Sequence, residues 1–93
     1  MIDATDWARD ILIRAHTAAR RFNPHAIIRV ARVGDQVQAV LAEAADAGDQ
    51  ELRIGEVTIY VEAELEGRID VEEPHDRLVL RAPGSAPNPR PQH

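Results

Sequence analysis

The sequence predicts an α+β fold in which one N-terminal helix packs on antiparallel β-hairpins. Two observations predict it. Apolar residues recur at spacings of three and four from Ala8 to Phe22, which is the period of an amphipathic helix. Further along, apolar and polar residues alternate on both sides of glycine-acid pairs, as in half-buried hairpins. Because each such hairpin has an apolar face that needs a cover, the helix is the expected covering layer.

The predicted helix runs from about Asp6 to Phe22. Thr5 is a suitable N-cap, and the carboxylate of Asp6 suits the positive end of the helix dipole. Asn23-Pro24 ends the helix, because proline disfavours helical geometry in the residue before it and has no N–H to donate. Four arginines on this helix form either a solvated face or a docking surface for a partner: Arg9, Arg14, Arg20 and Arg21.

Three hairpins are predicted after the helix. Residues 27–33 pair with 36–43 across Gly34-Asp35, which sets Ile28 opposite Leu41. Residues 52–54 pair with 57–61 across Gly55-Glu56. Residues 69–72 pair with 77–80 across the Glu73-Pro74-His75-Asp76 loop, which sets Glu72 beside Arg77 as an exposed ion pair. Residues 44–50 are expected to form a flexible connection, and 63–67 either an irregular link or one helical turn.

One domain, residues 1–82, is expected, followed by a disordered tail at 83–93. The tail holds four of the six prolines and no apolar run, and a ligand for a proline-reading module is the alternative reading of it. The apolar faces of the helix and hairpins define a predicted core: Ile11, Leu12, Ala15, Ile28, Val30, Leu41, Leu52, Ile54, Val57, Ile59, Val61, Ile69, Val71, Leu78 and Leu80.

The composition excludes several kinds of chemistry. The chain has no cysteine, which rules out disulfides, thiolate metal sites and thiol nucleophiles. No apolar stretch approaches the roughly 20 residues of a membrane span, and no leader pattern is present, so a soluble cytoplasmic protein is expected.

The net charge of −5 conceals a sorting of signs along the chain. Residues 9–32 hold six arginines and one acid, whereas 35–76 hold thirteen acids and two arginines. The acidic majority argues against nucleic-acid binding, and neither a nucleic acid nor a membrane is an expected partner. Opposite signs favour a protein partner or a homodimer, held by salt-sensitive contacts. The double change Arg20→Glu and Arg21→Glu is expected to weaken that association while leaving folding largely intact.

No catalytic, cofactor-binding or metal-binding residues are predicted. The four histidines lack metal-ligand spacing, the single serine, Ser85, lies in the tail, and the glycines form no phosphate-binding motif. The densest polar cluster consists of Glu72, Glu73, His75 and Asp76. It could hold a hard cation or offer an acid and a base, but hairpin loops are ordinarily rich in such residues.

Three short motifs nevertheless resemble a known family. Thr5-Asp6-Trp7-Ala8 is similar to a threonine-capped first helix. A glycine-containing strand region of the family is similar to Gly48-Asp49 followed by residues 55–61 (GEVTIYV). A later strand of the family is similar to Ile69-Asp70-Val71. Together with the order of helix, two hairpins and closing strand pair, these motifs resemble the A-type iron–sulfur assembly (HesB/IscA-like) family over most of residues 5–81.

The resemblance implies a HesB-like small domain, but the family's ligands are cysteines, and this chain has none. In place of the first ligand region stands Val33-Gly34-Asp35-Gln36, and in place of the last stands the proline-rich tail. The resemblance therefore implies a cysteine-less, degenerate member: a non-catalytic scaffold or accessory, interaction domain without cofactor. The alternative is a small metal-binding or acid/base protein that uses the Glu72, Glu73, His75, Asp76 loop.

Overall fold

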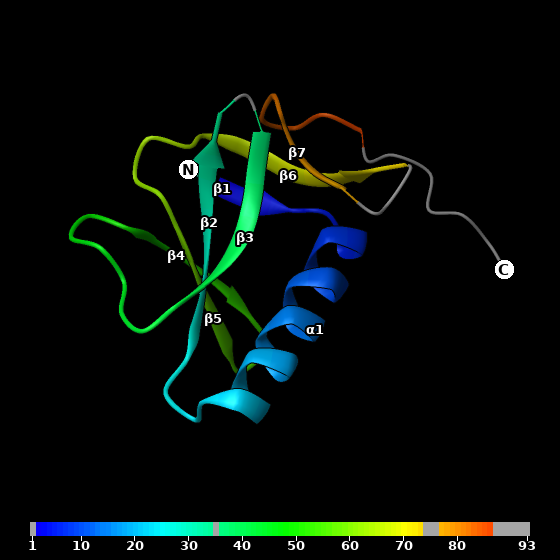
Figure 1. Cartoon of the computed structure of the whole chain (residues 1–93). Helices are drawn as coiled ribbons and strands as arrows, with labels where there is room; N and C mark the ends of the chain where they lie inside the picture. The colour runs from blue at the N-terminus through cyan, green and yellow to red at the C-terminus, as the bar shows by residue number, and fades with distance from the viewer. Residues whose placement is uncertain (1, 35, 74–76, 87–93) are drawn as a thin grey trace, which may run out of the picture.

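The computed structural model describes residues 2–34, 36–73 and 77–86, which form one helix and seven strands (Figure 1). In chain order these elements are β1 (Ile2–Ala4), α1 (Asp6–Phe22), β2 (Ile27–Val33), β3 (Gln36–Ala42), β4 (Gln50–Ile54), β5 (Val57–Val61), β6 (Gly67–Glu72) and β7 (Arg77–Arg81). The fold is α+β, as predicted, and it includes a short first strand that the sequence analysis did not predict.

Helix α1 has the predicted limits. The Thr5 Oγ1 atom accepts a hydrogen bond from the Ala8 N–H at 3.2 Å, and the Asn23 N–H donates to the Ala19 carbonyl at 3.0 Å. The buried side of the helix includes Ala8, Leu12 and Ala19. Phe22, which the periodicity placed on the same apolar stripe, is 88% exposed. It is the last residue of the helix, where the chain turns away toward β2.

All three hairpins have the predicted register. Ile28 pairs with Leu41, Ile54 with Val57, and Glu72 with Arg77. Asp35 of the first turn and residues 74–76 of the third loop lie outside the described residues.

The prediction of antiparallel hairpins is incomplete, because parallel pairs join them into two mixed sheets. β2 pairs in parallel with β5, giving a four-stranded sheet in the order β3-β2-β5-β4. β1 pairs in parallel with β6, giving a three-stranded sheet in the order β1-β6-β7. Alternation along a strand indicates which residues share a face, but it does not identify the next strand of the sheet.

The helix and the two sheets meet around one core. Figure 1 shows α1 along one side of the four-stranded sheet, with β6 and β7 running across the upper end of β2 and β3. α1 contacts β2 of the larger sheet and β6 of the smaller one, and β3 contacts β7 where the two sheets cross. This arrangement leaves each sheet with an edge strand at the junction.

Most of the predicted core is buried, and one member of it is not. Ten predicted residues are buried: Leu12, Ile28, Val30, Leu52, Ile54, Ile59, Val61, Ile69, Val71 and Leu78. Ile11, Ala15, Val57 and Leu80 are partly buried and pack against them. Leu41 was wrongly included, because it is 55% exposed. It does lie opposite buried Ile28, but it belongs to β3, at the edge of the sheet.

The link between β5 and β6 contributes a core residue that the sequence analysis missed. Leu65 is only 1% exposed, and its N–H donates to the Glu62 carbonyl at 3.0 Å, so residues 62–65 form a tight turn. At the other end of the described chain, Pro83-Gly84 forms a turn closed by a 3.1 Å bond from the Ser85 N–H to the Ala82 carbonyl. The rest of the predicted tail, residues 87–93, lies outside the described residues.

Among the described residues, no helix combines the length and the apolar character that crossing a membrane would require.

Candidate functional site

The polar residues that the sequence analysis singled out do not form a recognisable metal site where they can be described. The Glu72 carboxylate lies 2.9 Å from Arg77 Nη2 and 3.6 Å from Arg81 Nη2, so two guanidinium groups compensate its charge. Glu73 is exposed, and His75 and Asp76 lie outside the described residues. Within the described ranges, no three histidine or acidic side chains converge in a way that could hold a metal ion.

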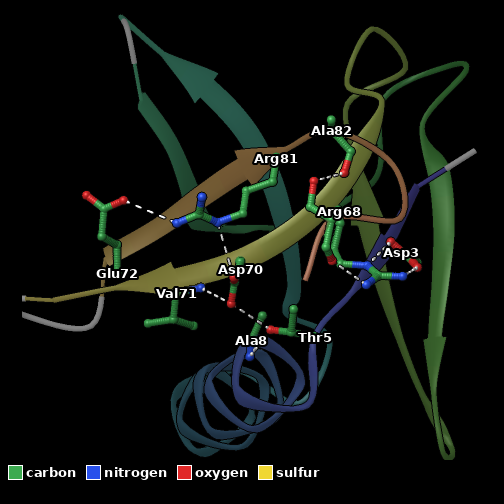
Figure 2. Close-up of polar contacts among 10 residues, drawn as sticks. Asp3, Thr5, Ala8, Arg68, Asp70, Val71, Glu72, Arg81 and Ala82 are labelled. Carbon is green, nitrogen blue, oxygen red and sulfur yellow. Dashed lines mark hydrogen bonds and ion pairs between the residues drawn. The ribbon is translucent and has the colours of Figure 1, made fainter. Parts of the chain in front are cut away.

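Charged side chains lie in a row on one face of the β1-β6-β7 sheet, and we call this row the charge ladder. It exists because alternate residues of paired strands share a face, so Ile69, Val71 and Leu78 point to the core while their neighbours point away. The charge ladder consists of Asp3, Arg68, Asp70, Glu72, Arg77 and Arg81. Figure 2 shows the side chains of the charge ladder other than Arg77, with the contacts among them.

Asp70 is the centre of the charge ladder and is completely buried. Its Oδ1 atom accepts hydrogen bonds from the Thr5 hydroxyl at 3.0 Å and from the Val71 N–H at 2.8 Å. Its Oδ2 atom accepts from Arg81 Nε at 3.2 Å. In Figure 2, Asp70 lies between the start of α1 and Arg81 on β7. A buried carboxylate is tolerated only with such partners, because an unpaired buried charge is strongly destabilising.

The Thr5 hydroxyl joins this network to the helix. It accepts the capping bond from the Ala8 N–H and donates to Asp70, so one oxygen atom connects the start of α1 to β6. The Thr5 N–H adds a backbone bond to the Ile69 carbonyl at 2.9 Å. The first turn of the helix is therefore fastened to the small sheet by both backbone and side chain.

Arg68 lies at the end of the charge ladder that is next to β1. Its Nε and Nη2 atoms donate to the two carboxylate oxygens of Asp3 on β1, at 3.3 and 3.2 Å. Its Nη1 atom donates to the Ser85 carbonyl at 2.7 Å. One guanidinium group thus connects β6 to the first strand and to the segment after β7.

A second buried ion pair lies on the four-stranded sheet. Arg29 of β2 donates from Nε and Nη2 to both carboxylate oxygens of Asp49, at 2.7 and 2.8 Å. The Asp49 side chain is 3% exposed and also accepts a 2.9 Å bond from the Asp46 N–H. The hydrogen bond from Arg29 is the main cause that lowers the pKa of Asp49, and it raises the pKa of Arg29 in turn.

The Arg29–Asp49 pair anchors the end of the connection at residues 44–50, which was expected to be flexible. The next residue, Gln50, donates from its side-chain amide to the Glu62 carbonyl at 3.2 Å and to the Leu65 carbonyl at 2.6 Å. The Gly48-Asp49 pair was the available signal in the sequence, but its partner Arg29 lies 20 positions earlier and was not identified.

The four helix arginines do not form one uniform surface. Arg9 Nε donates to the Ala4 carbonyl at 3.1 Å and Arg20 Nε to the Ala26 carbonyl at 2.8 Å, so both fix the backbone next to the helix. Arg14 and Arg21 instead line a shallow hollow of about 280 Å³ on the exposed side of α1. Burial and the nearby charge of Arg20 lower the pKa of His16, which favours its neutral form.

The charge ladder and the Arg29–Asp49 pair join strands, helix and connecting segments to one another. Their charged groups contact one another. Within the described residues, every buried side-chain nitrogen or oxygen has a hydrogen-bond partner. Comparison with protein families, with curated proteins and with solved structures gave no match.

Proposed function

We propose that this chain is a non-catalytic HesB-like scaffold, an accessory domain that acts by contacting another protein and that lacks iron–sulfur cluster ligands. The observation that carries the proposal is the 3.0 Å hydrogen bond between Thr5 and Asp70. These residues belong to two of the motifs on which the resemblance rests, and they are 65 positions apart in the sequence.

Each motif of the resemblance has a structural role that needs no cysteine. Thr5 caps α1, and Asp49 of the Gly48-Asp49 pair binds Arg29. Gly55 has a φ of +62°, which suits the two-residue turn between β4 and β5. Asp70 connects the helix, β6 and β7. A scaffold would keep these contacts whether or not a metal cluster is present, which supports a role based on shape.

The alternative function, a metal-binding or acid/base loop, is less well supported by the contacts of Glu72. A cation that used this carboxylate would compete with Arg77 and Arg81, whose guanidinium groups already lie beside it. These contacts favour the scaffold.

A metal titration followed by amide NMR tests the proposal. Fe²⁺, Zn²⁺ and Mn²⁺ are added separately to the full chain while the amide signals of Glu72, Glu73 and Arg77 are monitored. We expect no saturable change confined to this loop. Saturable shifts or broadening at micromolar metal, abolished in a Glu73→Gln variant and reversed by a chelator, would overturn the scaffold proposal in favour of the metal-binding alternative.

A further inference from the structure

A groove of about 470 Å³ lies between β7 and the tip of the β2–β3 hairpin. Its apolar lining residues are Val37 and Leu78, which are buried, and Val79 and Leu80, which are half-buried. Its rim carries the exposed side chains of Arg32, Gln36 and Arg77. The volume falls within the range of roughly 300 to 1,000 Å³ that is typical of binding clefts.

The groove runs along a free strand edge. β7 pairs with β6 on one side, and no other strand of the described chain pairs with its second edge. Residues 77–80 all line the groove, a length of roughly 13 Å at about 3.3 Å per residue. An edge strand exposes unpaired N–H and C=O groups at alternate residues, so it can accept an added strand from another protein.

Side-chain alternation along β7 specifies what the added strand should carry. Leu78 and Leu80 point to the core side of the sheet, whereas Arg77, Val79 and Arg81 lie on the side of the charge ladder. An added strand would alternate in the same way. Its core-side residues would meet leucine, and its outer residues would meet arginine.

Charge favours acids at the outer positions. Arg32 makes no ion pair within the described residues. Arg77 is paired with Glu72, but both side chains are more than 40% exposed, and ion pairs that exposed are weak. A carboxylate of a partner could therefore share the Arg77 guanidinium group at little cost.

A second copy of this chain is a poor occupant of the same edge. β7 reads Arg-Leu-Val-Leu-Arg, so an antiparallel pair centred on Val79 would set Arg77 of one copy opposite Arg81 of the other. The same clash would occur at both ends of the pair, and like charges directly opposite one another destabilise a sheet.

We propose that this groove binds an extended segment of a partner protein in which apolar and acidic residues alternate, added as a fourth strand beside β7. This inference rests on the proposed function as an interaction domain, and it names the surface and the chemistry of the partner. Backbone bonds to β7 would provide affinity, while Leu78, Leu80, Arg32 and Arg77 would select the sequence.

The test uses the full chain and a short synthetic peptide of alternating valine and glutamate, with blocked ends. Amide NMR is expected to show saturable shifts in residues 77–81 and at the described residues of the hairpin tip, together with slower amide exchange in β7. The double change Arg32→Glu and Arg77→Glu should weaken binding by about tenfold or more, because it reverses the two attractive charges. Arg53→Glu is the matched control, since Arg53 is an exposed arginine on β4, the edge strand at the other end of the larger sheet.

Four results would overturn the inference. A peptide of alternating valine and lysine binds as tightly as the valine–glutamate peptide, or the shifted amide signals lie outside the groove. Free glutamate alone causes the same shifts, or sedimentation shows that the chain self-associates through β7. Circular dichroism checks folding of each variant, and Arg32→Gln with Arg77→Gln replaces the reversed pair if that variant is unfolded. If the peptide does not bind and the metals also cause no saturable shifts, the proposed binding groove is refuted. The scaffold function is not, because the metal titration tests it separately.

Discussion

Replacing Thr5 by valine tests whether a single hydroxyl fastens α1 to the small sheet. Thr5 is 8% exposed and valine has nearly its shape, so the change mainly removes the hydroxyl. The lost capping bond from the Ala8 N–H is worth about 1 kcal/mol, and the lost bond to the ionised Asp70 about 1.5 to 3 kcal/mol. Because Asp70 keeps Val71 and Arg81 as partners, we expect Thr5→Val to lower the free energy of unfolding by about 2 to 4 kcal/mol.

Urea unfolding measures this loss, and Thr5→Ser is the matched control. Serine keeps the hydroxyl and both bonds, and it loses one buried methyl group worth about 1 kcal/mol. Combining Thr5→Val with Asp70→Asn should give less than the sum of the two single effects, because both changes remove the same bond. If Thr5→Val is no more destabilising than Thr5→Ser, the hydroxyl does not fasten the helix, and the structural argument for the scaffold loses its main support.

Three further changes test other contacts. Gly67 has a φ of +120° and a Cβ there would collide with the Arg81 carbonyl oxygen, so Gly67→Ala should cost at least about 2 kcal/mol more than Gly55→Ala, where the space is open. Equal losses in urea unfolding would refute this. Because Arg29 lowers the pKa of Asp49, the ionised pair stabilises the fold above about pH 4, and this contribution is lost as the pH falls through the pKa of folded Asp49. The Asp49→Asn variant should therefore be less stable than the unchanged protein at neutral pH, and its free energy of unfolding should fall less on acidification. If the two proteins give parallel curves of stability against pH, the argument is contradicted. Arg20→Glu should cost about 1 kcal/mol by breaking the bond to Ala26, whereas Arg21→Glu should change stability by less than about 0.5 kcal/mol. Thermal unfolding compares them, and indistinguishable variants would show that the Arg20 bond is not stabilising.

Local patterns in the sequence predicted the parts of the fold that depend on near neighbours. The limits of α1 follow from Thr5 and Asn23-Pro24, which act within one helical turn. The hairpin registers follow from short turns, as at Gly55-Glu56, because a two-residue turn fixes every pair behind it. The exposed Glu72–Arg77 pair was predicted for the same reason and is present at 2.9 Å.

Contacts between distant segments could not be predicted in the same way. β1 has only three residues, too few to show a period, and its partner β6 lies near the other end of the chain. Asp70 stands between Ile69 and Val71, which face the core, so alternation alone places it on the opposite face of the strand. Its complete burial depends on Thr5 and Arg81, which come from α1's cap and from β7. The central residue of the candidate site was therefore visible as a motif but not as a buried group.

The parallel pairing of β1 with β6 also sets an order in which the chain can fold. Each hairpin closes between neighbouring segments and can form early, whereas contacts between distant segments form slowly because a long loop must close first. During synthesis, Ile2 and Thr5 leave the ribosome long before their partners in Gly67–Glu72 exist. The start of α1 must therefore wait, uncovered and without its bond to Asp70, until most of the chain has been made. The strand that comes first in the sequence thus pairs with one that is made only after β2 to β5.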